Sequence, residues 1–371
     1  MKILHLNAAF AVAALFAAAV AGTAARAQTM DQVLEGAKKE GEVIIHVGPG
    51  KQFRDGRLKG FEEKYPFLKV HAINTANRES MPKLIRERQA GIYSLDVHMG
   101  GSPNLVRVYR PQGFLTPFRD AIVDKSLLDD KVWNGGFAGG FQDTGGQYIY
   151  AYNMVTNNLG HVNWSAVSKS DIKSLEDVLK PNLVTKIVWH DPRSPGPGFA
   201  TAMAIYFSYG EEFLTKLFQQ KSVFTNNRRQ AAEWVVRGRY PIGLGTSRDF
   251  MVPFEQQGLT KNVSEMPVAW VKTPTMSSGN GNIVMMDKAP HPNAAKLYIN
   301  WFLQKEQQQQ WTDLTDSASR RLDTKPAKPG LAPEPGKQYI DIFHEKQNDA
   351  MQKVLELARK TISAPPDKDE D

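Results

Sequence analysis

Apolar and polar positions follow two periods in the first third of the chain. Thr29 can cap a helix with apolar residues on one side, and Gly41 ends it. Short apolar runs predict strands at 42–47, 68–73 and 95–99, and a segment with helical spacing follows each of them. Because strand and helix alternate three times, the pattern predicts a parallel sheet covered by helices.

A Gly-rich stretch at 135–146 interrupts this alternation and precedes an aromatic strand at 147–153, as expected for a crossing between two lobes. The alternation then resumes. We expect strands at 186–190, 241–245, 268–271 and 282–286. We expect helices at 199–209 and 228–237, and a long helix that begins at 292. A Pro-rich linker at 325–336 then precedes a last helix at 338–362. The charged tail 363–371 is predicted to be disordered.

The segment 186–198 has the composition of an anion site. An apolar strand ends in a Pro/Gly loop, and a helical pattern follows, so backbone N–H groups would point away from a strand's carboxyl end. Arg193 in this loop could hold a carboxylate or phosphate through two parallel hydrogen bonds. Arg248 follows the next such strand, so the two guanidinium groups could converge on one anionic group. A surface or hinge salt bridge is the alternative for each.

The N-terminus predicts export. Lys2, the apolar run 8–20 and the segment Ala25, Arg26, Ala27 match a secretory signal, with cleavage near Ala27. A retained anchor is the alternative, but the run is shorter than a membrane span. The mature protein is therefore expected to be exported and soluble. The chain has no cysteine, so its fold must rest on a hydrophobic core without disulfides.

Length and charge narrow the class further. The 371 residues exceed what one core usually takes, so two domains are expected. The formal net charge of +7 falls by two when the signal is removed, which suits small anions and is too small for a nucleic-acid partner. Phosphate-loop, zinc-protease and nucleophile-elbow patterns are missing, so we expect a binding protein and no cofactor.

Five segments in the same order resemble periplasmic solute-binding proteins of ABC importers, in the branch that includes the ferric-ion-binding proteins. They are 95–102, 150–153, 186–192, 238–244 and 289–303. The resemblance implies an α/β fold of type II: two lobes, each a mainly parallel sheet flanked by helices, joined by crossing hinge strands. It places 28–145 and 268–310 in lobe 1, and 146–267 and 311–362 in lobe 2. It also implies a monomer that delivers its ligand to a membrane permease.

The same resemblance argues against iron. In that branch a histidine, an acid and two adjacent tyrosines bind ferric ion, and the corresponding places here hold Gly50, Gly101 and the region 246–249. Ferric ion needs anionic oxygen ligands, which glycine does not supply. Arg248 would repel a cation and attract an anion. Branch members with such features bind organic anions, so a phosphorylated, phosphonate or carboxylate solute is the leading hypothesis.

Several polar residues near the expected cleft are candidate ligand contacts. Some have ordinary structural alternatives: Ser102 can serve only as a helix cap, Tyr152 and Asn153 can order the hinge, and Ser278 can lie in a flexible turn. The candidate set is Lys51, Gly101, Ser102, Tyr152, Asn153, Arg193, Ser194, Ser247, Arg248, Ser278 and Asn280.

Two other functions remain open from the sequence. His46, His98 and His190 each lie near a strand's carboxyl end, and three histidines can bind zinc, so a metal-assisted periplasmic hydrolase is one alternative. A receptor for a metal ion or polyamine is the other. It would need acids in the cleft, for which Asp191, Asp249 and Glu265 are the candidates.

Overall fold

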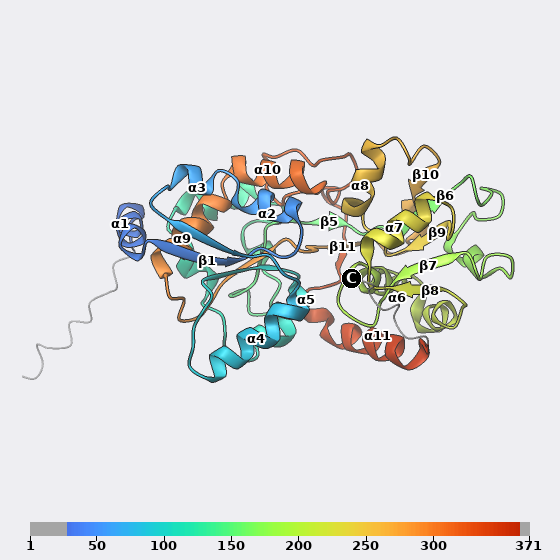
Figure 1. The fold of residues 1–371 in the computed structure, drawn as a ribbon, viewed down its shortest axis with the longest axis horizontal. Helices are drawn as coiled ribbons and strands as arrows, with labels where there is room; N and C mark the ends of the chain where they lie inside the picture. Colours follow the sequence, from blue (N-terminus) through green and yellow to red (C-terminus); the bar gives the residue numbers. More distant parts are fainter. Residues whose placement is uncertain (1–27, 364–371) are drawn as a thin grey trace, which may run out of the picture.

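The computed structural model describes residues 28–363, so the expected signal and all but the first residue of the expected tail lie outside the described residues. The described chain forms two lobes, each built on a five-stranded sheet (Figure 1). In lobe 1 the strand order is β2-β1-β3-β12-β4, with β1 parallel to β2 and β3, and β12 antiparallel to β3 and β4. Its strands are β1 (Glu42–His46), β2 (Lys69–Ile73), β3 (Val97–Gly100), β4 (Tyr150–Ala151) and β12 (Asn282–Met285).

Two helices of lobe 1 begin where the sequence predicts, at Met30 and at Pro292. The first has Thr29 as N-cap, a capping box with Gln32, and Gly41 in the left-handed region at its end. Pro292 starts the helix whose buried face enters the core of this lobe. The helices are α1 (Met30–Glu40), α2 (Lys51–Leu58), α3 (Phe61–Lys64), α4 (Asn77–Gln89), α5 (Ser102–Asn104), α9 (Pro292–Phe302) and α10 (Lys305–Thr315).

Lobe 2 has the strand order β10-β6-β9-β7-β8, in which β7 is parallel to β8 and β9. Gly210, with φ of 81°, interrupts the long helix α6 near the end of the predicted helical segment. The elements are β6 (Gly160–Asn163), β7 (Ile187–His190), α6 (Pro197–Phe218), β8 (Val223–Thr225), α7 (Arg228–Val236), β9 (Ile242–Leu244), α8 (Arg248–Gln256), β10 (Val263–Glu265) and α11 (Asn348–Thr361).

A small sheet connects the lobes. β11 (Thr275–Ser277) pairs with β5 (Val155–Thr156) on one side and β13 (Ile340–Asp341) on the other. The chain enters lobe 2 through β4 and β5 and returns through β11 and β12, as expected for crossing strands. The C-terminal segment runs from β13 to α11, which packs on α6 of lobe 2. On the way, Glu345 accepts hydrogen bonds from Thr144 and pairs with Arg110 of lobe 1.

The structure corrects three expectations. Residues Val268–Trp270 form a 3-10 helix, and the crossing strand is β11 instead. The last helix begins at Asn348, ten residues later than expected. The lobe boundaries also differ: β4 belongs to the lobe 1 sheet, and α10, with buried Trp311, packs on α2 in lobe 1. Lobe 1 therefore extends past both 145 and 310.

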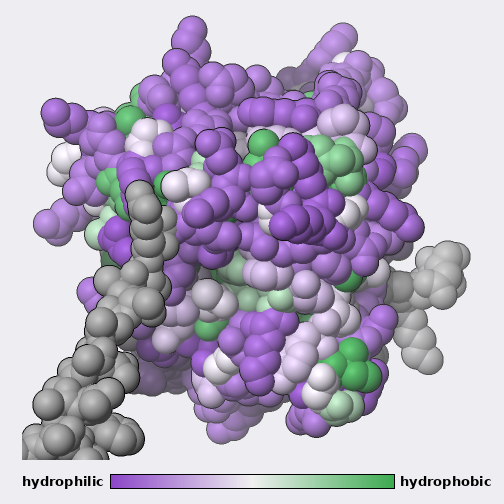
Figure 2. Space-filling view, turned by 90° about the vertical axis from the view of Figure 1, so that its left-hand side faces the viewer, coloured by the Kyte–Doolittle hydropathy of each residue, from purple (hydrophilic) through white to green (hydrophobic). Residues whose placement is uncertain are grey.

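The outer end of lobe 1 is predominantly hydrophilic, with small hydrophobic areas scattered over it (Figure 2). Within residues 28–363, every helix is either too short or too polar to cross a membrane.

Candidate ligand-binding cleft

A cavity of about 720 Å³ lies between the lobes, where parallel strands of both sheets end. The loops after β1 and β3 reach it from lobe 1, and those after β7, β8 and β9 reach it from lobe 2. This is the edge at which open α/β sheets bind ligands. The main lining segments are 48–50, 99–101, 155–158, 194–197, 226–229 and 245–250.

The two walls of this cleft differ in chemistry. Phe53, Met81, Met99 and Trp311 give the lobe 1 wall an apolar surface. On the lobe 2 wall, α6, α7 and α8 all begin at the cleft, so their first backbone N–H groups lie along this wall. Lobe 1 therefore adds apolar surface to the cleft, and lobe 2 adds backbone N–H donors.

The candidate residues divide into those that line this cleft and those that do not. The lining residues are Gly101, Asn153, Ser194, Ser247, Arg248 and Asn280. The remaining candidates, Lys51, Ser102, Tyr152, Arg193 and Ser278, are not among the lining residues.

Arg193 is held by its neighbours. Its Nε donates to Asp191 Oδ1 at 2.9 Å and its Nη2 donates to Asp191 Oδ2 at 2.6 Å. Nη1 also reaches the carbonyl of Ile362, at the end of the last helix. The guanidinium neutralises a buried carboxylate and ties the loop after β7 to the C-terminal segment. The structure thus gives Arg193 the salt-bridge role that the sequence left as the alternative.

Arg248 lines the cleft but is also paired. Its Nη2 donates to Glu265 Oε2 at 2.8 Å, and its Nε donates to the other carboxylate oxygen. Burial raises the pKa of Glu265, yet the hydrogen bond and charge of Arg248 outweigh burial, so this pKa lies below its ordinary value. The pair presents little net charge to the cleft.

Three more candidates lie outside the lining of the cavity. Lys51 pairs with Asp55 one turn later, and its side chain is 86% exposed. Ser102 is fully buried and donates to the carbonyl of Phe343 at 3.2 Å, which ties lobe 1 to the C-terminal segment. Ser278 is buried, and its hydroxyl has no hydrogen-bond partner among the described residues.

Tyr152 and Asn153 anchor the crossing strand. The Asn153 amide donates to Ser278 O at 3.1 Å, and its oxygen accepts from Trp311 Nε1 at 3.0 Å and from Ser317 Oγ at 2.6 Å. The Tyr152 hydroxyl accepts from Arg57 Nε at 3.1 Å and from Arg57 Nη2 at 3.0 Å. Both side chains order the hinge, and Asn153 also lines the cleft.

Arg57 is a cleft residue that the sequence did not predict. It is fully buried on α2, lines the cavity, and lies 4.8 Å from the ring centre of Trp311. Besides Tyr152, it donates to the carbonyls of Val47 and Asn280. Within residues 28–363 its guanidinium forms no ion pair with a carboxylate. A buried arginine stays protonated, so this is a positive charge without a counter-ion beside the cavity.

Other missed residues follow β8. Asn226, Asn227, Arg228 and Arg229 line the cleft, and Asn227 caps α7 by accepting from the backbone of Gln230. The helix was predicted, but β8 before it was not, so the loop between them could not be placed at the sheet edge.

Unpartnered donors also face this region. Asn157 and Ser247 both line the cleft, and Asn157 Nδ2 and Ser247 Oγ are buried without a hydrogen-bond partner among the described residues. Such groups are costly unless a ligand or water satisfies them.

The three histidines do not come together. His46 and His98 stack in lobe 1, with ring centres 4.2 Å apart, whereas His190 of lobe 2 accepts from the backbone N–H of Gly198. Burial lowers the pKa of His46 to about 4. Among residues 28–363 no group of three or more His, Cys, Asp or Glu side chains could hold a metal ion.

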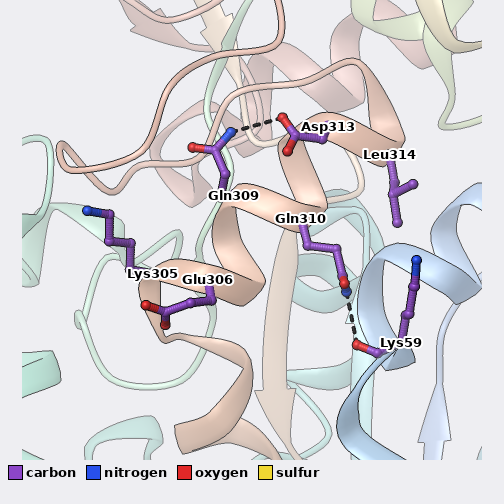
Figure 3. Close-up of a pocket in the computed structure, with 7 residues that line it drawn as sticks. All are labelled: Lys59, Lys305, Glu306, Gln309, Gln310, Asp313 and Leu314. Carbon is purple, nitrogen blue, oxygen red and sulfur yellow. Dashed lines mark hydrogen bonds between the residues drawn. The ribbon is translucent and has the colours of Figure 1, made fainter.

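A second hollow, of about 510 Å³, lies along α10 on lobe 1 (Figure 3). Its two glutamines are paired within the hollow: Gln310 donates to the carbonyl of Lys59 at 3.0 Å, and Gln309 donates to Asp313 at 2.9 Å. The interlobe cleft, with its unpaired cation and donors, is therefore the candidate site.

Sequence comparison identifies the class. Residues 57–323 match the family described as bacterial extracellular solute-binding protein, and the chain belongs to that family. Members of this family are described as extracellular, which is consistent with the export signal expected at the N-terminus. An uncharacterized protein of Haemophilus influenzae is 23% identical over 341 residues, which cover 88% of this chain and 91% of that protein.

Solved structures show the same type II periplasmic-binding-protein fold. Iron-bound HitA from Pseudomonas aeruginosa superimposes with a TM-score of 0.64 at 15% identity, covering 86% of this chain and 99% of HitA. AfuA from Actinobacillus pleuropneumoniae, with bound fructose-6-phosphate, superimposes with a TM-score of 0.61 at 20% identity, covering 87% of this chain and 99% of AfuA. The chain therefore combines an extracellular solute-binding family with this two-lobed fold.

Proposed function

We propose that this chain captures a small organic anion, either phosphorylated, phosphonate or carboxylate, and delivers it as a monomer to a membrane permease. Arg57 is the observation that carries this proposal. Its buried positive charge borders the cavity without a carboxylate partner among the described residues. An uncompensated buried charge is unfavourable, and an anion in the cleft would relieve this cost.

The lobe 2 wall supports the same preference. Three helices begin there, and anions are stabilised by helix N-termini through free N–H groups and the helix dipole. Arg229 adds a further positive charge on this wall. Among the relatives, AfuA holds a sugar phosphate and HitA holds iron. The charges of this cleft favour the first kind of ligand.

In this proposal the ligand contacts Gly101, Asn153, Ser194, Ser247, Arg229, Arg248 and Asn280. The charge of the buried Arg57 acts on the ligand from beneath the cleft surface. Arg193 supports the loop after β7 through its pair with Asp191. Lobe closure around the anion would remove water from it and shift the population toward the form that the permease recognises.

The test is a thermal-shift screen of the mature protein with sugar phosphates, vitamin phosphates, phosphonates and carboxylates, and with metal ions and polyamines. We expect stabilisation by at least one anion. Arg57→Met should abolish this shift, whereas Lys51→Met, which removes an equal charge outside the cleft lining, should preserve it. Stabilisation by cations alone would contradict the proposal.

A further inference from the structure

Two opposite charges stand at the starts of neighbouring helices on the lobe 2 wall. Arg229 is in the first turn of α7 and Asp249 is in the first turn of α8, and both line the interlobe cavity. The two helices pack together, and the Arg228 guanidinium lies 5.8 Å from the ring centre of Phe250. One small ligand can therefore reach both helix starts.

The protein neutralises two other charges of the same cleft. Arg248 is paired with Glu265, and Asp316 accepts from Lys328 Nζ at 2.9 Å. Asp249 differs, because within the described residues its half-buried carboxylate makes neither a hydrogen bond nor an ion pair. The exposed guanidinium of Arg229 likewise has no such partner in residues 28–363.

An unpaired carboxylate has a direct effect on the choice of ligand. When the Asp249 carboxylate and the anionic group of the ligand are about 7 Å apart, at an effective dielectric constant of about 20, their repulsion weakens the binding of a plain anion roughly fiftyfold. A donor on the ligand counteracts this effect, because a hydrogen bond to a charged group strengthens binding by about tenfold to more than a hundredfold. Asp249 therefore disfavours a plain anion and favours one that brings its own donor.

We propose that Asp249 determines specificity by selecting an anion that carries a hydrogen-bond donor, either a hydroxyl or an ammonium group, while Arg229 receives the anionic group. This inference rests on the proposed function. It narrows the ligand class to hydroxylated or amino-substituted organic anions.

The experiment compares ligands that share a skeleton: ethylphosphonate, hydroxyethylphosphonate and aminoethylphosphonate, with propyl phosphate and glycerol phosphate as a second series. Dissociation constants are measured by calorimetry for the mature protein, Asp249→Asn and Glu255→Gln. The last variant is a matched control, because Glu255 is on the same helix and is not among the residues that line the cleft.

We expect the mature protein to bind a donor-bearing ligand at least tenfold more tightly than its plain counterpart. Asp249→Asn should tighten binding of the plain anion by more than about tenfold and weaken binding of the donor-bearing one, while Glu255→Gln preserves the discrimination. Opposite changes of this kind would not follow from a purely structural role. The relative affinities of the hydroxyl and amino compounds identify the donor.

Equal changes for both kinds of ligand in Asp249→Asn would overturn the inference and leave the anion proposal standing. If no member of either series binds the mature protein and the broader screen also finds no anion, the proposed function fails, and this inference fails with it.

Discussion

Replacing Arg57 separates the charge of the cleft from its architecture. Arg57→Met removes the cation but keeps a side chain of similar length. For an anion about 6 Å from the guanidinium, the lost attraction is roughly 3 kcal/mol at an effective dielectric constant of about 20, or about a hundredfold in Kd. The acceptors on Val47, Asn280 and Tyr152 also lose their donor. Each costs about 1–3 kcal/mol when left unsatisfied.

Part of this loss of stability is offset, because the variant no longer buries a charge. We therefore expect the free energy of unfolding to fall by about 2–4 kcal/mol. Arg57→Lys keeps the charge but cannot reach all three acceptors, so it should lose similar stability and less than about tenfold in affinity. Urea unfolding followed by circular dichroism gives the stability, and calorimetry with the anion found by screening gives Kd. Equal losses of affinity in both variants would refute the role assigned to charge.

Three further predictions concern stability and charge. The pKa of His46 is lowered from 6.5 to about 4 in the fold, so its stabilisation is complete above pH 6.5 and is lost as the pH falls toward 4. Between pH 7 and pH 5, His46 should contribute about 2 kcal/mol to the decrease in the free energy of unfolding measured with urea. A His46→Gln variant should make the decrease smaller by about that amount. Glu265→Gln releases the charge of Arg248 and should strengthen anion binding severalfold while lowering the melting temperature; unchanged affinity would contradict the neutralisation described here. Gly198→Ala would place its Cβ 1.6 Å from a carbonyl oxygen of β7 and should unfold the loop at the cleft, whereas Gly145→Ala, whose nearest neighbour is 3.6 Å away, should be tolerated in thermal melts.

Periodicity and caps predicted most elements because they depend on local sequence. Thr29 with Gln32 and Gly41 defined the first helix, and the apolar run before Pro195 defined β7. The prediction of a strand at 268–271 was wrong because short apolar runs are ambiguous. Four such residues can form a 3-10 turn as easily as a strand.

The candidate site was harder to predict because side-chain pairing depends on distant parts of the chain. The partner of Arg193 is two residues away, but that of Arg248 is Glu265, which reaches it only through the β6 and β10 pairing. Arg57 has no sequence signature at all. It lies on the helix next to apolar residues, and only the assembled lobe shows that its guanidinium replaces a core side chain beneath the cleft.

The two ends of the described chain belong to different lobes. The first helix, α1, packs on α9 at the outer end of lobe 1, and the last helix, α11, packs on α6 of lobe 2 (Figure 1). Any change in the angle between the lobes must therefore change the separation of these two helices. A donor and an acceptor fluorophore attached to them would convert ligand capture into an optical signal, without any label near the cleft.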